Sequence, residues 1–277
     1  MHQEQYIEVN NTSIRYQDSA GEGDVVLLTH GIGSSLEIWA EQVKGMSVNY
    51  RVIVWDIPGH GLSGFGKQPY EIADFAQFAW EFLDKLKIQR VNLAGNSMGG
   101  AISIQMYGLQ PNRVKKIALL NSATLGRDTP LPFKLMCLPL LGRLMAQPNQ
   151  MAIDQQINAI FFEPAAVSAE LLSVVKRNVL RDGAQQAFLN TLKRMTSVWG
   201  QKNSLVNKAK DILSSSKIPI LYMHGRQDQV IPYCHSQAGQ QITPNSSLEI
   251  IENCGHTPQV EMPWKINTLL SDFFAQN

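Results

Sequence analysis

Short apolar runs alternate along the chain with segments whose apolar residues recur at helical spacing. Compact runs are typical of buried strands, whereas apolar residues three or four positions apart predict an amphipathic helix. Helices are predicted over residues 72–86 and from Ser97 to about residue 109, where Pro111 follows. Strands are predicted at residues 6–9, 13–16, 25–29, 51–55, 91–94, 114–120, 218–224 and 248–251. Because parallel neighbours need crossover connections, this order predicts an α/β fold: a mostly parallel sheet with helices on both faces.

Two features of the pattern locate a hairpin and an insertion. The first two runs flank Asn10-Asn11, which predicts a leading hairpin. Between the sixth and seventh runs, residues 127–213 are helical in character, contain several prolines and show no clear strand. We therefore expect a body formed by residues 1–126 and 214–277, with residues 127–213 inserted as a helical unit.

Composition and charge indicate which partners to expect but add little about the fold. The 277 residues carry a formal net charge of +1, which gives no argument for a nucleic acid or an acidic partner. The charge is uneven, because residues 127–210 hold 11 Lys and Arg against 5 Asp and Glu. The first residues lack a signal-peptide pattern and no apolar run is long enough to span a bilayer, so a cytoplasmic protein is expected.

Cysteine usage gives no sign of a disulfide framework. Cys137, Cys234 and Cys254 are odd in number and lack metal-ligand spacing. Cys254 lies two residues before His256. We interpret it as a buried bystander rather than as a reactive thiol.

The most informative motif is Gly95-Asn96-Ser97-Met98-Gly99, which follows the strand predicted at 91–94. A serine that is lifted clear of a strand end needs a turn so sharp that side chains two residues before and after it would collide with the backbone. Gly95 and Gly99 remove that collision. The pattern therefore predicts a nucleophile elbow that presents the Ser97 hydroxyl, although the motif alone also fits an ordinary glycine-rich turn.

A serine nucleophile needs a base and a group that orients the base. His256 follows Gly255 between the last predicted strand and the last helix, where it can reach across the strand ends. Asp228 lies just beyond the strand predicted at 218–224, and taken alone it would fit a surface aspartate that caps a helix. The chain order Ser97, Asp228, His256 is the order expected when the three residues come from successive strand ends of such a sheet.

Acyl transfer also needs donors for the oxyanion that forms. The candidates are the backbone amides of Ile32, between Gly31 and Gly33, and of Met98, directly after the serine. Met98 begins a predicted helix, where unpaired amides and the helix dipole favour negative charge.

These motifs together resemble the α/β-hydrolase superfamily over nearly the whole chain. The residues that carry the resemblance are His30-Gly31-Ile32-Gly33, Asp56-Ile57-Pro58-Gly59-His60-Gly61-Leu62-Ser63, Gly95-Asn96-Ser97-Met98-Gly99-Gly100, Gly225-Arg226-Gln227-Asp228 and Gly255-His256. The resemblance implies an eight-stranded sheet and a helical cap after the sixth strand, which suits residues 127–213.

The superfamily also supplies alternatives. Haloalkane dehalogenases and epoxide hydrolases carry aspartate where Ser97 stands, which argues against both. The elbow is similar to that of carbon–carbon hydrolases of aromatic degradation, and also to that of carboxylesterases and monoacylglycerol lipases. Carbon–carbon hydrolases commonly have tryptophan directly after the histidine, where this chain has Thr257. A third class, a binding protein on the same fold, usually shows a damaged triad, which this sequence does not.

The predicted cap bears on the substrate. An apolar stretch over residues 131–145 could receive an acyl chain or rest on lipid, but cations and prolines interrupt it, and we favour packing of the cap onto the body. Asn96 and Arg181 are candidate substrate-binding residues, and Arg181 would favour a carboxylate-bearing substrate.

The sequence thus predicts a serine hydrolase of small carboxylic esters that needs no metal or organic cofactor. The expected partner is a small-molecule ester, and a homodimer is left open.

Overall fold

A computed structural model describes residues 3–67 and 70–276. Its centre is an eight-stranded sheet with the order β1-β2-β4-β3-β5-β6-β9-β10. The β1–β2 hairpin is antiparallel, β2 also pairs antiparallel with β4, and all other pairs are parallel. The strands are β1 Gln5–Val9, β2 Thr12–Asp18, β3 Val25–Thr29, β4 Arg51–Trp55, β5 Val91–Asn96, β6 Val114–Leu120, β9 Ile220–Gly225 and β10 Ser246–Ile251. The predicted fold class, hairpin and eight strands are confirmed.

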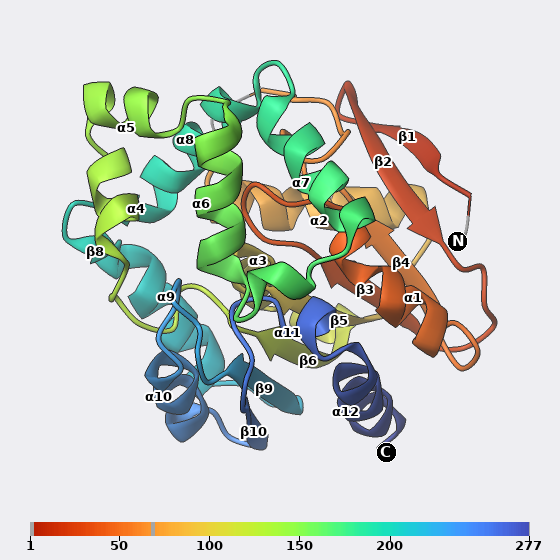
Figure 1. Ribbon diagram of the computed structural model, residues 1–277. Helices are drawn as coiled ribbons and strands as arrows, with labels where there is room; N and C mark the ends of the chain where they lie inside the picture. The colour runs from red at the N-terminus through yellow and green to blue at the C-terminus, as the bar shows by residue number, and fades with distance from the viewer. Residues whose placement is uncertain (1–2, 68–69, 277) are drawn as a thin grey trace.

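Helices cover both faces of the sheet, as Figure 1 shows. Side chains alternate along β3, so that Leu27 joins one apolar cluster with α2, α3 and α9, while Val26 and Leu28 join the other with α1 and α12. Burial on both faces explains why these strands are continuous apolar runs. The helices of the body are α1 Ala40–Met46, α2 Ile72–Lys85, α3 Met98–Leu109, α9 Asn203–Ser214, α10 Cys234–Ile242, α11 Pro258–Glu261 and α12 Pro263–Ala275, with 3₁₀ turns η1 Leu36–Trp39 and η2 Pro111–Arg113.

Between β6 and α9 the chain forms the short helices that were predicted as a cap, and this segment is called the cap below. It contains α4 Leu131–Met136, α5 Pro139–Met145, α6 Gln150–Ile160, η3 Pro164–Ala166, α7 Ala169–Leu180 and α8 Ala184–Met195, and a ribbon of β7 Thr196–Ser197 with β8 Gly200–Gln201. Figure 1 draws α6 and α7, in green, above the sheet. Of the helices within the described ranges, none has the length and hydropathy that crossing a bilayer requires.

Two details of this region differ from the sequence pattern. The short β7–β8 ribbon stands where no strand was expected, because two-residue strands leave no periodic signal. Helix α9 falls inside the predicted insertion, yet its Ala209 and Leu213 belong to the cluster that packs α2 and α3 against the sheet. The packing therefore favours a body that resumes near Asn203.

Candidate active site

Ser97 stands on a strained turn at the end of β5. Its φ of 57° and ψ of −118° lie where residues with a Cβ are rare. A Cβ on Gly95 would lie 2.2 Å from the carbonyl oxygen of Gly99, and one on Gly99 would lie 2.1 Å from that of Thr29. Both contacts are with backbone and cannot be relieved by a side-chain movement. The two glycines are therefore required for the reason that the motif suggested.

Hydrogen bonds fix the turn to the neighbouring strand. The Ser97 amide donates to the carbonyl of Leu120 over 2.9 Å, and the Ser97 carbonyl accepts from the amide of Ala123 over 3.0 Å. Helix α3 begins at Met98, and Ser97 is buried. The backbone on both sides of the candidate nucleophile is thus held by β6 and the loop that follows it.

Asp228 and His256 come from the loops after β9 and β10, which are adjacent parallel strands. The Nδ1 of His256 donates to Oδ2 of Asp228 over 2.8 Å. The other carboxylate oxygen, Oδ1, accepts from the amides of Val230 and Ile231. These two amides fix the carboxylate so that Oδ2 faces the imidazole.

Asp228 stays ionised despite its burial. Burial raises the pKa of this carboxyl, but the charge of His256 and the hydrogen bonds from His224 and His256 lower it by more. The resulting pKa lies well below the usual range of a carboxyl group. A permanently charged carboxylate is what an orienting group needs in order to stabilise a neighbouring imidazolium.

Two residues around Asp228 were not identified from the sequence. Asn121, at the end of β6, donates from Nδ2 to Oδ2 of Asp228 over 2.7 Å and to the carbonyl of Gly255 over 3.0 Å. His224, the penultimate residue of β9, has Nε2 3.1 Å from Oδ2 of Asp228 and 2.9 Å from the carbonyl of Ile231. Both partners are acceptors, so the His224 Nε2 carries a proton. The sequence feature that could have identified them is a polar residue at the end of each apolar strand.

Asn96 holds the His256 loop against the elbow. Its Nδ2 donates to the carbonyl of His256 over 3.0 Å and to that of Leu120 over 3.3 Å. Because Asn96 precedes Ser97, these bonds bring the histidine loop to the residue beside the candidate nucleophile. The structure gives the side chain of this predicted substrate-binding residue partners within the protein, at 2% exposure.

The glycine loop after β3 lies against Ser97. A Cβ on Gly31 would lie 3.0 Å from the Ser97 Cβ, so this loop passes directly beside the serine. Within residues 3–67 and 70–276, the amides of Ile32 and Met98 donate to no protein acceptor. Both predicted oxyanion donors are therefore unused in the folded chain.

His30 fixes the orientation of this loop. Burial, and then the charge of His60, lower the pKa of His30 to about 3, so its ring is neutral at ordinary pH. Nε2 accepts from the amide of Ile57 over 3.1 Å, which leaves Nδ1 to donate to the Gly31 carbonyl over 2.7 Å. That bond fixes the direction of the Gly31 carbonyl, and with it the orientation of the peptide bond between Gly31 and Ile32.

The cap reaches the site at two points. Above Gly33, whose φ is +70°, a Cβ would lie 3.3 Å from the ring of Phe188 on α8. At the foot of α6, the carbonyl of Ile160 accepts from the His256 amide over 2.9 Å. The cap thus covers the glycine loop and touches the backbone of the candidate base.

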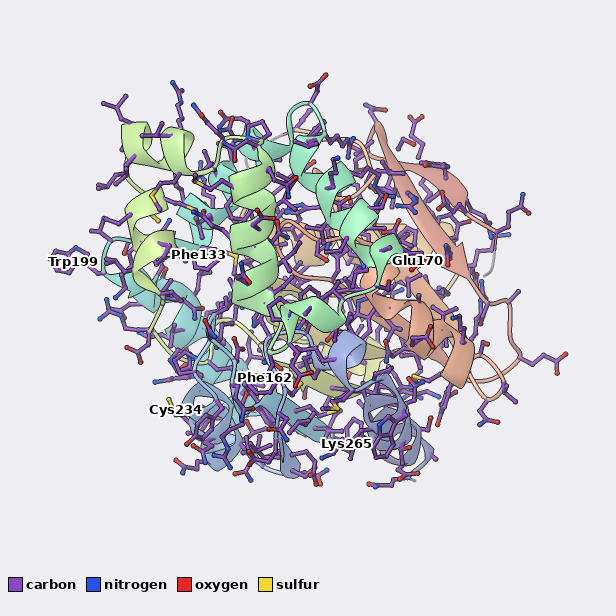
Figure 2. The ribbon with its side chains drawn as sticks, viewed as in Figure 1. Phe133, Phe162, Glu170, Trp199, Cys234 and Lys265 are labelled. Carbon is purple, nitrogen blue, oxygen red and sulfur yellow. The ribbon has the colours of Figure 1, made fainter. Side chains whose placement is uncertain are left out.

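Glu261 joins the cap to the histidine loop. Its carboxylate accepts from the amides of Gly255 and Thr257 at 3.1 Å and from the amide of Phe162 at 2.8 Å. Figure 2 shows Phe162 at the lower end of α6, beside α11. One carboxylate therefore fixes residues on both sides of His256 together with the cap segment that follows α6.

Arg181 does not lie free in the structure. Its guanidinium donates to the carbonyls of Gly61 and Ser63 over 2.5 and 2.7 Å and stacks 4.5 Å above the ring of Phe65. The structure therefore uses this predicted substrate-binding residue to attach the cap to the loop after β4.

The thiol nearest to the site is inert. Cys254 is buried, and burial followed by the charges of Glu261 and Asp228 raises the pKa of its thiol well above the usual range. Among the described residues, no three His, Cys, Asp or Glu side chains are grouped as metal ligands would be.

Comparison with known proteins agrees with this architecture. The sequence model of the family described as the alpha/beta hydrolase fold matches residues 24–263. The chain belongs to the alpha/beta hydrolase family. It is a hydrolase of that fold, and the resemblance inferred from the motifs is confirmed.

The relatives of this alpha/beta hydrolase have diverse names. The dihydrolipoyllysine-residue acetyltransferase component of the acetoin cleaving system of Pseudomonas putida is 28% identical over 99% of this chain and 70% of that protein. A 2-hydroxy-6-oxononadienedioate/2-hydroxy-6-oxononatrienedioate hydrolase of Pseudomonas sp. is 26% identical over 96% of this chain and 93% of the relative. A thermophilic esterase of Thermogutta terrifontis superposes with a TM-score of 0.80 at 19% identity, covering 98% of each chain, and this likeness concerns the fold.

Proposed function

We propose that this alpha/beta hydrolase is a serine esterase that cleaves small carboxylic esters through an acyl-enzyme. The observation that supports the proposal most strongly is the hydrogen bond of 2.8 Å between His256 and an ionised Asp228, in a loop that Asn96 ties to the strained turn at Ser97. Nucleophile, base and orienting acid are then neighbours at the carboxyl ends of β5, β9 and β10.

In the first half-reaction, the Ser97 hydroxyl oxygen attacks the ester carbonyl while His256 takes the hydroxyl proton at Nε2. Nε2 is available because Nδ1 is committed to Asp228. The carbonyl π electrons move to oxygen, and the amides of Ile32 and Met98 donate to the oxyanion. Collapse expels the alcohol, which receives the proton from His256.

In the second half-reaction, water attacks the acyl-enzyme and His256 takes its proton. The second tetrahedral intermediate collapses to release the carboxylic acid and returns the proton to Ser97. Asp228 stabilises the imidazolium in each half-reaction, for which its low pKa suits it. No step requires a metal or an organic cofactor.

A second candidate is the hydrolysis of a carbon–carbon bond in a dienoic oxo acid, on the same residues. The relative named for 2-hydroxy-6-oxononadienedioate, aligned over 96% of this chain, favours it. Against it stands Thr257, whose hydroxyl lies 3.3 Å from the Ile160 carbonyl and from Glu261, where carbon–carbon hydrolases commonly place an aromatic ring. A binding protein without catalysis is a third class, and it would leave Ser97 unreactive.

One experiment separates these functions. Wild type and Ser97→Ala are treated with a fluorophosphonate probe and assayed with p-nitrophenyl esters of increasing acyl length and with a ring-fission product. We expect labelling and ester turnover in wild type only. Turnover of the ring-fission product in preference to every ester would support the second candidate. A folded wild type that is neither labelled nor active would indicate a binding protein.

A further inference from the structure

Large apolar side chains are exposed on one edge of the cap. Leu140 is 84% exposed and Trp199 is 78% exposed. They lie on α5 and in the β7–β8 turn, on the same side of the molecule as α4 in Figure 1. We call this surface the cap patch; its members are Leu131, Leu138, Leu140, Leu144, Val198 and Trp199.

The preferred interpretation of residues 131–145, that they pack the cap onto the body, is wrong for four of the six leucines in that stretch. Packing onto the body accounts for partly buried residues such as Phe133, which Figure 2 shows on α4, but it leaves four leucines in solvent. In the same view Trp199 projects outward, away from the body. The elements that carry these residues are neighbours, because α4 packs against α5 and against β7. Exposed apolar side chains gathered in this way mark an interaction surface.

Cations outnumber acidic residues around the cap patch. Lys134 and Arg143 lie within α4 and α5, and residues 129–153 contain no Asp or Glu. An Nη of Arg127 lies 3.4 Å from the Trp199 carbonyl. Lys193, in the last turn of α8, and Lys202, directly after β8, add cations beside the β7–β8 ribbon, which packs against α4.

We propose that the cap patch docks on an anionic lipid surface. Leucine side chains on short helices can enter the boundary between head groups and acyl chains, and an exposed tryptophan suits the interface itself. The surrounding lysines and arginines then meet lipid phosphates, each contributing electrostatic attraction.

The charge around the cap patch favours a lipid surface over a second copy of the chain as the occupant. A two-fold interface formed by the cap patch would place the same cations of both copies face to face, which opposes association. An anionic membrane surface instead complements them. The occupant that fits both the leucines and the charge is therefore a lipid surface.

Docking would orient the molecule with its cap toward the lipid. The Gln185 amide on α8 donates to the Arg143 carbonyl on α5 over 2.9 Å, and α8 also carries Phe188, which stands over Gly33. The cap patch is therefore continuous with the helices that cover the candidate active site. The docking does not depend on the proposed esterase chemistry.

The test is sedimentation with vesicles. The 277-residue protein with Ser97→Ala, which cannot turn over lipid through the proposed nucleophile, is mixed with vesicles of pure phosphatidylcholine or of equal parts phosphatidylcholine and phosphatidylglycerol. The second variant adds Leu140→Ser and Trp199→Ser. The matched control adds Trp264→Ser on α12, where the tryptophan is 72% exposed away from the cap. Thermal melts verify that each variant is folded.

We expect binding to the anionic vesicles that weakens with added salt and falls about tenfold or more in the cap-patch variant, with the Trp264→Ser control unchanged. Absence of binding to the anionic vesicles at low salt would overturn the proposal, as would equal loss in the control. A wild-type dimer in solution that the cap-patch substitutions convert to a monomer would instead assign the surface to self-association. Ester turnover by the wild type is measured separately, so failure of one proposal leaves the other standing.

Discussion

Ser97 has a backbone conformation that costs free energy in the folded chain. A residue with a Cβ at a φ of 57° and a ψ of −118° is strained by about 1–3 kcal/mol, whereas glycine is not. We therefore expect Ser97→Gly to be more stable than Ser97→Ala by about 1 kcal/mol, because alanine keeps the strained Cβ while glycine removes it.

Urea denaturation of the two variants measures this difference, and neither should turn over esters. Equal midpoints, or a less stable glycine variant, would show that the turn stores no strain at this residue.

At the scale of single residues, the sequence predicts a site from residues whose chemistry and position along the chain coincide. Ser97, Asp228 and His256 each follow an apolar strand. In the structure the loops that carry them lie at the carboxyl ends of the strands of one sheet. Asn121 also follows a strand, but a single amide has no reactive role that would distinguish it from a turn residue. Glu261 was not predicted because its partners are backbone amides. Nearly every residue has such an amide, so the sequence carries no pattern for this contact.

At the scale of elements, the loop between β10 and α11 depends on Glu261. Replacing this carboxylate with an amide removes charge-assisted bonds to the amides of Gly255, Thr257 and Phe162. We expect Glu261→Gln to lower the free energy of unfolding by about 2 kcal/mol. Ester turnover should fall about tenfold, because a small displacement of His256 costs reactivity.

The matched control is Glu252→Gln, which breaks only the exposed pair with Arg226. Urea denaturation and kcat for a p-nitrophenyl ester are measured for both variants. Full activity in a stable Glu261→Gln protein would show that the carboxylate does not position the loop.

Element boundaries were predictable where burial sets the pattern. The strands Val25–Thr29, Arg51–Trp55 and Val114–Leu120 begin and end where their apolar runs do. β9 begins two residues later than predicted, after Pro219, which has no amide hydrogen to pair. Helix α1 was missed because seven residues give too few turns for a periodic signal.

At the scale of the whole molecule, a partly buried ion network joins the cap to the body. Glu37 pairs with Arg177 of α7 over 2.9 Å and with the buried Arg15 over 2.6 Å. Burial raises the pKa of Glu37, but the bonds from Arg177 and Arg15 lower it by more, to about 2.

Because the folded pKa lies below the ordinary value of 4.5, the carboxylate stabilises the fold at higher pH and loses that effect as the pH falls from about 4.5 toward 2. The full lowering of this pKa corresponds to roughly 3–4 kcal/mol at most. We expect Glu37→Gln to reduce stability near neutral pH and to flatten the loss of stability between pH 5 and 3, as measured by urea midpoints across that range.

Arg194→Gln provides the comparison, since it removes a second cap-to-body ion pair, with Glu71, in which both side chains are 44% exposed. That variant should change stability by less than about 1 kcal/mol. An acid limb of unchanged steepness in Glu37→Gln would contradict the assignment of the pH dependence to this network.

The bond from the His256 amide to the Ile160 carbonyl, at the foot of α6, connects the cap directly to the backbone of the candidate base. A movement of α6 that breaks this bond also releases the histidine loop from one of its supports. If binding of an acyl group beside His256 is coupled to the position of α6, thermodynamic linkage makes that coupling reciprocal, and the acyl group would shift the position of α6 by the same free energy. The cap and the base would then respond to a substrate jointly, and substitutions in the foot of α6 would change the affinity for acyl groups that they never touch.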